Sequence, residues 1–533
     1  MNNSDLIIAT IKKAGINCGY GIPSGNVLPL MEAMRLGGVE FILTAHEGSA
    51  GFAADVMGRL TDRPGLCIST LGPGATNLAT GIGNAWLDRS PMLAITCNLN
   101  TSQIGRRIQM YIDHHSLFRP ITKATLALRS GNIGKTMSEA IKLALSEPQG
   151  PVHLDLPEDV ALAETNENIP EIFDGDLPPV ASEKNLTKGI QILRKAKRPV
   201  AILGSSAMRL KDFSLLKKFI EQYNLPFGST TMAKGLIDES HPLSIGCIER
   251  ACRQHQRQFL NSADLIVGIG YDTIEVEYEA WIGKTPLLQV DIEPVDIESD
   301  VTLIHQITGD LSRSLKFFIS KQPTKNTWSL NELKKHRENF HKKLRPNSDL
   351  FTAFQAIDAV QSALPKDGIL SFDVGAHTHQ IASQWNTPRP HSFLITNGWS
   401  SMGFGLPAAI AAKIACPGRE VVCLIGDGCF QMTCGELATA KRLGLNLPVV
   451  VLDDRWLALI RIKQMRRQFG IYGTELQEEK YRDPPEHYFG VPAFGVSDPK
   501  NLEKKIKEAL KAKHPTVIEA LVNSDHYLET VFD

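Results

Sequence analysis

The chain lacks the features that would direct it to a membrane or to nucleic acid. Its 57 basic and 58 acidic side chains leave a formal net charge of −1, so no overall field attracts nucleic acid or an anionic membrane surface. It has no apolar run of about 18 residues, which predicts no transmembrane helix. Residues 1–15 lack the basic start and apolar core of a secretion signal. We therefore expect neither nucleic acid nor a membrane as a partner.

Paired cysteines and a dinucleotide fingerprint are also missing. The nine cysteines are odd in number and scattered, without Cys-x-x-Cys pairs or histidines at zinc spacing. This pattern fits reduced thiols and predicts a cytoplasmic protein without a disulfide framework or a structural zinc site. No Gly-x-Gly-x-x-Gly run is followed by an acidic residue about 20 positions later, which argues against an NAD-type oxidoreductase.

Apolar, strand-like runs alternate with helical patterns along most of the 533 residues. This alternation predicts an α/β protein built on parallel sheets. Two polar stretches interrupt it: residues 164–183 are rich in proline and acid and predict a linker, and residues 321–349 predict a long surface connector. We therefore expect three doubly wound parallel-sheet domains, at residues 1–163, 184–320 and 350–533.

One motif in the third block points to a metal-bound phosphate. Gly426, Asp427 and Gly428 follow one apolar run, and Asp453 and Asp454 follow the next, so that Asp454 lies 27 residues after Asp427. Because the carboxyl ends of parallel strands meet at one edge of a sheet, we expect these carboxylates to converge. Carboxylate oxygens suit Mg²⁺, and glycines let backbone N–H groups approach a phosphate. The alternative interpretation is an ordinary turn whose acidic residues face water.

The motif resembles that of thiamine-diphosphate enzymes, which opens with Gly-Asp-Gly and usually closes with Asn-Asn. The order of the three blocks is similar to that of the pyruvate-decarboxylase-like branch. The resemblance implies that the first domain binds the aminopyrimidine (PYR domain), the third binds the diphosphate (PP domain), and the central one is structural or carries an auxiliary nucleotide. It also implies that Mg²⁺ is held by Asp427, Asp454 and the backbone carbonyl of Trp456. The departure is Asp453, whose charge would weaken cofactor binding unless a basic group or a proton compensates.

Other segments extend this resemblance. Residues 44–55 are similar to the segment of the catalytic glutamate, which implies that Glu47 binds N1′ of the aminopyrimidine so that the 4′-amino group can remove the C2 proton. Residues 397–407 are similar to the segment that bends the cofactor, with Met402 between the two rings and the carbonyl of Ser400 accepting from the 4′-amino group. The expected cofactor-binding residues are Glu47, Gly375, Ala376, His377, Ser400, Met402, Gly426, Asp427, Gly428, Cys429 and Asp454.

Further segments lean toward acetolactate synthase, which joins two pyruvate molecules into 2-acetolactate and releases CO₂. Residues 400–410 and 117–123 are close to that family's version, and residues 267–275 resemble the catabolic, flavin-independent branch, so FAD is not expected. Gln109 lies near the position of an active-site glutamine in these synthases. Lys463, however, stands where anabolic synthases carry the tryptophan that lines the second-substrate site.

Two alternatives stay open at this point. The chain could be a simple decarboxylase of an aryl or branched 2-oxo acid, in which case His114 and His115 could supply acid–base groups, or they could be surface histidines. It could also be a non-catalytic homologue that only binds thiamine diphosphate. Glu47, Asp427 and Met402 argue against that last alternative, since each is needed for chemistry more than for folding.

The resemblance also bears on assembly. In this family the domains that share one cofactor come from different chains, which implies a homodimer or a dimer of dimers with active sites at the subunit interface.

Overall fold

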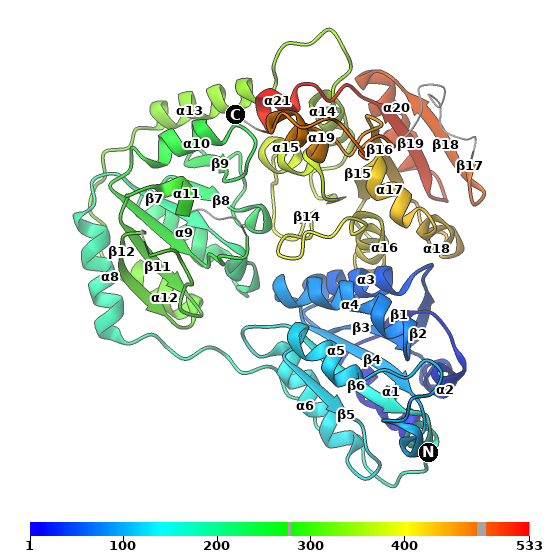
Figure 1. The fold of residues 1–533 in the computed structure, drawn as a ribbon. Helices are drawn as coiled ribbons and strands as arrows, with labels where there is room; N and C mark the ends of the chain where they lie inside the picture. Colours follow the sequence, from blue (N-terminus) through cyan, green and yellow to red (C-terminus); the bar gives the residue numbers. More distant parts are fainter. Residues whose placement is uncertain (276–278, 300, 477–486, 532–533) are drawn as a thin grey trace.

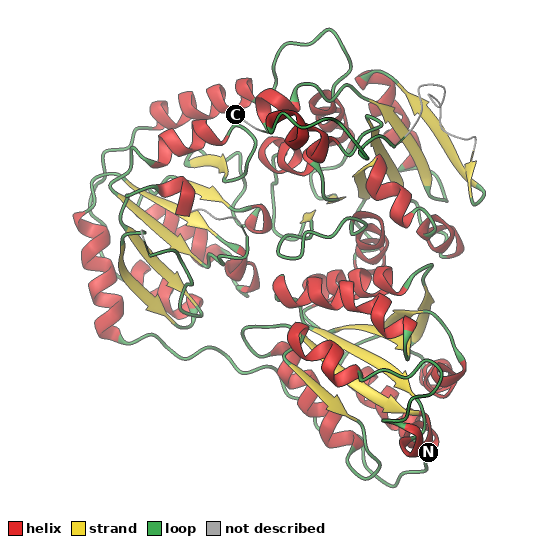
Figure 2. Cartoon of the chain, viewed as in Figure 1, coloured by secondary structure: helices red, strands yellow, loops and turns green. Residues whose placement is uncertain are grey.

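The computed structural model describes residues 1–275, 279–299, 301–476 and 487–531 (Figure 1). Its described residues form three sheets, one after another along the chain, each flanked by helices (Figure 2). This confirms the predicted α/β class with three parallel-sheet domains. One short strand pairs antiparallel at the edge of the third sheet, which the sequence did not predict. Among the described helices, none is long and apolar enough to cross a membrane.

The first sheet contains six described strands in the order β2-β1-β3-β4-β6-β5, and all of its pairings are parallel. Its strands are β1 (Cys18–Gly21), β2 (Glu40–Leu43), β3 (Gly65–Thr70), β4 (Met92–Asn98), β5 (Ala124–Ala127) and β6 (Pro151–Pro157). Its helices are α1 (Asn3–Lys13), α2 (Leu28–Gly37), α3 (Glu47–Thr61), α4 (Pro73–Leu87), α5 (His114–Phe118), α6 (Ile133–Leu145) and α7 (Glu158–Leu162).

The central sheet has the order β12-β11-β10-β7-β8-β9, the doubly wound order in which ligand crevices form between the first and fourth strands. Its strands are β7 (Pro199–Leu203), β8 (Phe227–Ser229), β9 (Ser244–Cys247), β10 (Leu265–Ile269), β11 (Leu287–Asp291) and β12 (Leu303–Thr308). Its helices are α8 (Glu183–Lys195), α9 (Ser214–Gln222), α10 (Arg253–Leu260), α11 (Glu279–Ile282) and α12 (Leu311–Ile319).

The third sheet has the order β14-β13-β15-β16-β19-β18-β17. Its strands are β13 (Ile369–Phe372), β14 (Phe393–Leu394), β15 (Val421–Gly426), β16 (Pro448–Asp453), β17 (His487–Tyr488), β18 (Val491–Val496) and β19 (Thr516–Leu521). Its helices are α14 (Ala353–Ala363), α15 (Ala376–Gln384), α16 (Gly405–Ala415), α17 (Asp427–Thr433), α18 (Glu436–Arg442), α19 (Ala458–Arg466), α20 (Pro499–Ala509) and α21 (Tyr527–Thr530).

The two connecting stretches differ. Residues 165–182, all of them described, contain no helix or strand, as expected of a linker. The second stretch forms α13 (Leu330–Lys343). Trp328 and Leu333 are buried in the core of the central domain, and the indole N–H of Trp328 donates to the carbonyl of Pro199 at 2.8 Å. This connector is therefore partly built into the core, because its apolar side chains cover the end of the central sheet.

The first and third domains share one hydrophobic core, in which α3 of the first domain packs against α16 of the third and α4 packs against α3 (Figure 1). Phe52 on α3 meets Phe404 edge to face, with ring centroids 5.8 Å apart. The helices α3 and α4 approach closely because both crossing points are glycine: a Cβ added at Gly51 would come within 2.7 Å of the Cα of Gly81. This packing fixes the positions of α3, which begins at Glu47, and of α16, which follows the Met402 turn.

Candidate active site

Three aspartates gather at the carboxyl edge of the third sheet, at the ends of the neighbouring parallel strands β15 and β16. The backbone N–H of Arg455 donates to Asp427 Oδ2 at 2.8 Å and to Asp453 Oδ1 at 3.1 Å. The N–H of Gly428 donates to Asp427 Oδ1 at 2.7 Å, and that of Trp456 donates to Asp454 Oδ1 at 3.0 Å. The strand–helix–strand unit thus brings together the carboxylates that the sequence predicts to converge.

The electrostatics of this edge fit a site for a hard divalent cation. Burial and the neighbouring carboxylates of Asp454 and Asp453 raise the pKa of Asp427 well above its ordinary value. Burial raises the pKa of Asp454 to about 6, against the opposing effects of the Trp456 N–H and the charge of Arg461. The Oδ2 atom of Asp453 is buried and has no hydrogen-bond partner among the described residues. A cation there would supply the positive charge that these oxygens lack.

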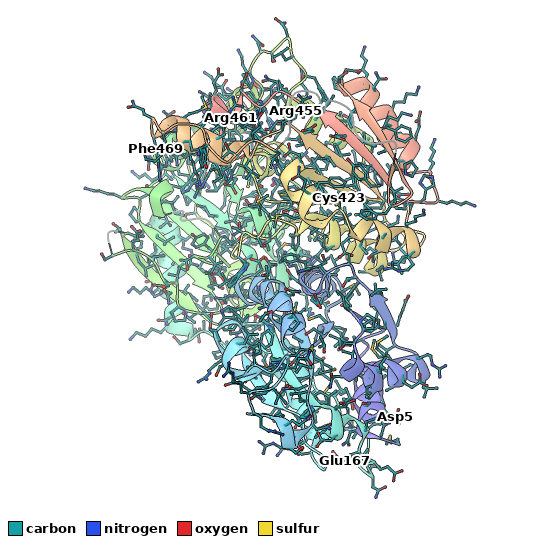
Figure 3. The ribbon with its side chains drawn as sticks, turned by 45° about the vertical axis from the view of Figure 1, so that its right-hand side comes forward. Asp5, Glu167, Cys423, Arg455, Arg461 and Phe469 are labelled. Atoms are coloured by element: carbon teal, nitrogen blue, oxygen red, sulfur yellow. The ribbon has the colours of Figure 1, made fainter. Side chains whose placement is uncertain are left out.

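A basic side chain lies beside the acidic cluster. Arg461 on α19 stacks over the ring of Trp456, with its guanidinium carbon 4.2 Å from the ring centroid; Figure 3 labels Arg461 together with Arg455. Its charge opposes the rise in the pKa of Asp454. Arg461 is therefore a basic group that can compensate the extra negative charge of Asp453. The sequence pattern alone did not identify it.

The structure brings Met402 to the same edge. A Cβ added at Gly428 would lie 2.8 Å from Leu457 Cδ2 and 3.2 Å from Met402 Cε, so the methionine side chain ends against the glycine that follows Asp427. Glycine at this position leaves room for that contact. The structure thus brings Met402 next to the acidic motif, although Met402 and Asp427 are 25 residues apart in sequence.

The first turn of α15, which follows β13, provides His377 and a second pair of glycine contacts. A Cβ added at Gly375 or Gly426 would come within 2.8 Å of the His377 ring, so the imidazole lies between the loop and the acidic motif. Burial, and next the charge of His379, lower the pKa of His377 to about 4, which keeps the ring neutral. Its Nε2 is buried and lacks a hydrogen-bond partner within the described parts of the chain. Ala376 begins α15 beside it, and Cys429 Sγ contacts the carbonyl of Val374 at 3.1 Å.

Asp373, which follows β13 and which we did not predict as a site residue, fixes the Met402 turn. Its Oδ1 accepts from Gly403 N at 3.0 Å and its Oδ2 from Gly405 N at 2.8 Å. The side chain is fully buried. The turn itself has Ser400 in the left-handed region, at φ +50°. The signal in the sequence was an acidic residue directly after an apolar, strand-like run, and it drew less attention than the glycines nearby.

Glu47 is the first residue of α3, with His46 as the N-cap whose Nδ1 accepts from Gly48 N at 3.0 Å. Glu47 is 9% exposed, and its Oε2 accepts from the side-chain amide of Asn77 at 3.1 Å. A Cβ added at Gly74 would lie 3.4 Å from its Oε1, so the first turn of α4 approaches this carboxylate. Asn77 is a hydrogen-bond partner that the sequence analysis did not identify.

The three other candidates lie elsewhere in the first domain. Gln109 is exposed in the loop between β4 and α5. His114 is 1% exposed, and its Nδ1 lies 2.9 Å from Thr96 Oγ1 and 3.2 Å from Asp155 Oδ1, so its ring takes part in a buried polar network. His115 is partly exposed and contacts Thr125 Oγ1 at 2.7 Å. Catalytic roles for these three residues stay predictions.

Comparisons with known proteins agree with this geometry. Sequence models of thiamine pyrophosphate enzymes match the chain in three successive parts: the N-terminal TPP binding domain at residues 1–117, the central domain at 186–317 and the C-terminal TPP binding domain at 373–520. Over its whole length the chain is 30% identical to the probable acetolactate synthase large subunit of Methanocaldococcus jannaschii, of which the match covers 93%. The chain belongs to the thiamine pyrophosphate enzyme family.

Within this family the relatives point to one branch. The probable acetolactate synthase large subunit of Methanococcus aeolicus is 29% identical over all of this chain and 94% of its own length. The acetolactate synthase isozyme 1 large subunit of Escherichia coli is 28% identical over 98% of this chain and 94% of its own. The protein is thus an acetolactate synthase-like enzyme that depends on thiamine diphosphate, as the resemblance predicted.

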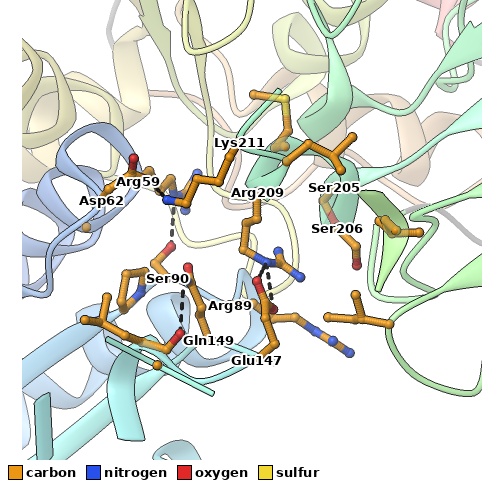
Figure 4. A pocket seen from close by; sticks show the side chains of 18 of the residues that line it. Arg59, Asp62, Arg89, Ser90, Glu147, Gln149, Ser205, Ser206, Arg209 and Lys211 are labelled. Atoms are coloured by element: carbon orange, nitrogen blue, oxygen red, sulfur yellow. Dashed lines mark hydrogen bonds and ion pairs between the residues drawn. The ribbon is translucent and has the colours of Figure 1, made fainter. Parts of the chain in front are cut away.

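This thiamine pyrophosphate enzyme also contains a cavity of about 620 Å³ where its three domains meet. Among the described residues that line it, none is a predicted site residue. Its charged walls pair with each other: Lys211 with Asp62 at 3.2 Å, and Arg209 with Glu147 at 2.8 Å (Figure 4). Arg59 of α3 also lies on the wall, which places the end of that helix at the domain junction.

Proposed function

We propose that this enzyme condenses two molecules of pyruvate into 2-acetolactate with release of CO₂, using thiamine diphosphate anchored by Mg²⁺. The observation that carries the proposal is the buried carboxylate edge at β15 and β16, which contacts the Met402 turn. Similarity to acetolactate synthase large subunits over the full chain supports the choice of reaction.

Each group has an assigned role in this proposal. Asp427, Asp454 and the carbonyl of Trp456 would hold Mg²⁺. The diphosphate would be surrounded by Gly426, His377 and the N–H groups near Gly375, Ala376, Gly428 and Cys429.

When bound, the cofactor supplies an electron-accepting thiazolium that permits decarboxylation of a 2-oxo acid. Glu47 would share a proton with N1′ of the aminopyrimidine, and the Ser400 carbonyl would orient the 4′-amino group.

Burial supports the role assigned to the His377 ring. Because its pKa is lowered to about 4, the imidazole is neutral near pH 7 and offers a hydrogen-bond donor without a charge. The Nε2 atom, which has no hydrogen-bond partner among the residues that the structure describes, gives it one position at which to meet a phosphate oxygen. The side chain of Met402, which ends against Gly428, would lie between the two rings of the cofactor.

The proposal includes assembly into a homodimer or a dimer of dimers, with Glu47 serving the cofactor held by the partner's third domain. Exposed apolar side chains on the third domain support an interface there, among them Met432 on α17 at 61% and Phe469 beyond α19 at 62% exposure. Apolar surface of this kind is stabilised when a second protomer covers it.

One assay tests the reaction. Purified protein is incubated with Mg²⁺, thiamine diphosphate and pyruvate, without added flavin, and CO₂, acetaldehyde and acetolactate are measured separately. We expect CO₂ and acetolactate in a one-to-one ratio. Aldehyde alone would replace this proposal with the simple decarboxylase, and cofactor uptake without any product from a panel of 2-oxo acids would indicate the non-catalytic homologue.

A further inference from the structure

The backbone turn that carries Ser400 and Met402 adopts an unusual conformation. Ser400 has φ +50° and Gly403 has φ +94°. A non-glycine residue with positive φ is uncommon and persists where its surroundings hold it in place. Asp373 holds the exit of the turn through the N–H groups of Gly403 and Gly405. The entry of the turn requires a second support.

That support comes from the other domain. Asp88, which follows α4, accepts from Asn397 N at 3.1 Å through Oδ2 and from Gly398 N at 2.8 Å through Oδ1. Its side chain is 2% exposed. Each end of the turn is thus bound by one buried carboxylate that takes two backbone N–H groups, Asp373 from the third domain and Asp88 from the first.

Arg59 fixes Asp88 and also contacts the turn directly. Its guanidinium donates to Asp88 Oδ2 at 2.9 Å, to Asp55 Oδ2 at 2.6 Å and to the carbonyl of Ile395 at 2.7 Å. It lies 5.5 Å over the ring of Phe404, at the exit of the turn. The Arg59 side chain is only 13% exposed and forms hydrogen bonds on several sides, so its guanidinium is held in one place. Its hydrogen bond to Asp88 in turn fixes the position of that carboxylate.

We propose that Arg59 and Asp88 are positioning residues that hold the cofactor-bending turn from across the domain boundary. The inference rests on the proposed function, because the roles of Ser400 and Met402 toward the cofactor are part of that proposal. Glu47 and Arg59 lie on the same helix, about 18 Å apart along its axis. In the proposed dimer, α3 therefore joins the carboxylate of one active site to the cofactor turn of the other.

The test is the substitution Asp88→Asn. The amide keeps one oxygen for one backbone N–H, turns an NH₂ toward the other, and removes the charge that faces Arg59. Asp62→Asn is the matched control, since Asp62 lies just past the end of α3 with its side chain 78% exposed. Arg59→Lys keeps the positive charge and loses the several fixed donors.

Three quantities are measured below the melting temperature of each variant: the Kd of thiamine diphosphate with Mg²⁺ by calorimetry, kcat at saturating cofactor, and the near-ultraviolet circular dichroism of the bound cofactor. We expect Asp88→Asn to raise the Kd about tenfold and to lower kcat at least tenfold even at saturation, because a misplaced turn misplaces the rings. For Arg59→Lys we expect a Kd and a kcat between those of Asp88→Asn and the wild type. For Asp62→Asn we expect both values to stay within twofold of the wild type.

A purely structural role would lower the melting temperature while leaving kcat at saturation and the dichroism of the bound cofactor unchanged; that result overturns the proposal. If Asp88→Asn does not fold, Arg59→Lys is judged by the same criteria. Failure of the proposed function looks different, since the wild-type protein itself would then take up no thiamine diphosphate.

Discussion

The first and third sheets arrange their strands in the same order, β2-β1-β3-β4-β6-β5 and β14-β13-β15-β16-β19-β18, with β17 added at one edge of the third. The residue that follows the third strand is Leu71 in the first domain and Asp427 in the third. Leu71 is a buried apolar residue, whereas Asp427 meets two other carboxylates. The shared topology gathers strand ends at one edge of each sheet, and the residue placed after the third strand decides whether that strand end is apolar or acidic.

The two sheets can also be compared at their second strands, β2 and β14. The second strand of the first sheet leads into Glu47 and α3, and the second strand of the third sheet leads into the Met402 turn and α16. These two helices occupy equivalent places in their domains and pack against each other. In the proposed function the two strand-to-helix connections would supply different parts to the chemistry: a carboxylate from the first domain and a shaped turn from the third.

Asp427→Asn should have the largest effect. The substitution removes a proposed metal ligand, and we expect cofactor uptake to disappear and activity to fall about 10⁴-fold. The protein without cofactor should be no less stable, because the change relieves repulsion among buried carboxylates. Calorimetric titration with thiamine diphosphate and Mg²⁺ measures the first effect, and thermal unfolding the second. Asp349→Asn, at an exposed position, is the control; normal uptake by Asp427→Asn would contradict the metal assignment.

Glu47→Gln should have the next largest effect. The amide has nearly the same shape but cannot share a proton with the cofactor, so we expect kcat to fall about 10²- to 10⁴-fold. The hydrogen bond from Asn77 can still reach the remaining oxygen, so folding and cofactor affinity should be kept. Steady-state kinetics and calorimetry on the same preparation separate the two. Near-normal turnover would remove Glu47 from the catalytic role.

Leu71→Ala probes the position equivalent to Asp427. Leu71 is 1% exposed, so truncation leaves a cavity and should lower the free energy of unfolding by about 3 kcal/mol. The Kd for thiamine diphosphate should change less than twofold. Denaturant unfolding with and without cofactor checks both statements, and a selective loss of cofactor binding would contradict the contrast drawn between the two edges.

Gly51→Ala tests the contact between α3 and α4. The added methyl group would meet the Cα of Gly81 at 2.7 Å, so the helices must separate, at a cost of about 2 kcal/mol. Gly418→Ala is the control, because a Cβ there has nothing within 4 Å. Melting temperatures of the two variants measure the difference, and equal values would show that the crossing is more adaptable than its geometry implies.

The smallest effect concerns an ion pair that ties the central domain to the third. Glu249 Oε1 lies 3.0 Å from His379 Nδ1 on α15. Although burial alone would raise it, the His379 charge and several hydrogen bonds lower the pKa of Glu249 from 4.5 to about 2. Glu249 therefore contributes stability that is present above pH 4.5 and is lost as the pH falls from 4.5 toward 2.

Glu249→Gln should remove about 1–2 kcal/mol of stability near pH 6, and its difference from the wild type should shrink as the pH falls from 4.5 toward 2. Unfolding by denaturant at several pH values checks this. Glu147→Gln, which breaks the corresponding pair with Arg209 between the first and central domains, serves as the comparison. A difference that stayed constant between pH 6 and pH 3 would show that titration of Glu249 plays no part.

The sequence was most informative where a motif is local. The apolar run before Asp427 and the glycines around it predicted a strand end with backbone N–H groups available, and the structure places Asp427, Asp453 and Asp454 together there. It was less informative about His114, because the same three letters, Asp-His-His, fit an acid–base pair or a structural network. Burial and the contact with Asp155 are properties of the folded domain.

The order of apolar and polar residues by itself determined the α/β class, the three sheets and the acidic edge, since strand propensity and glycine turns act over a few residues. Only the tertiary structure decided how the Met402 turn is held. Asp88 and Gly398 lie 310 residues apart in different domains, and no local pattern records that a buried carboxylate in one will accept an N–H from the other. Such a bond forms only after both domains have folded and packed, because its strength depends on the water that this packing removes.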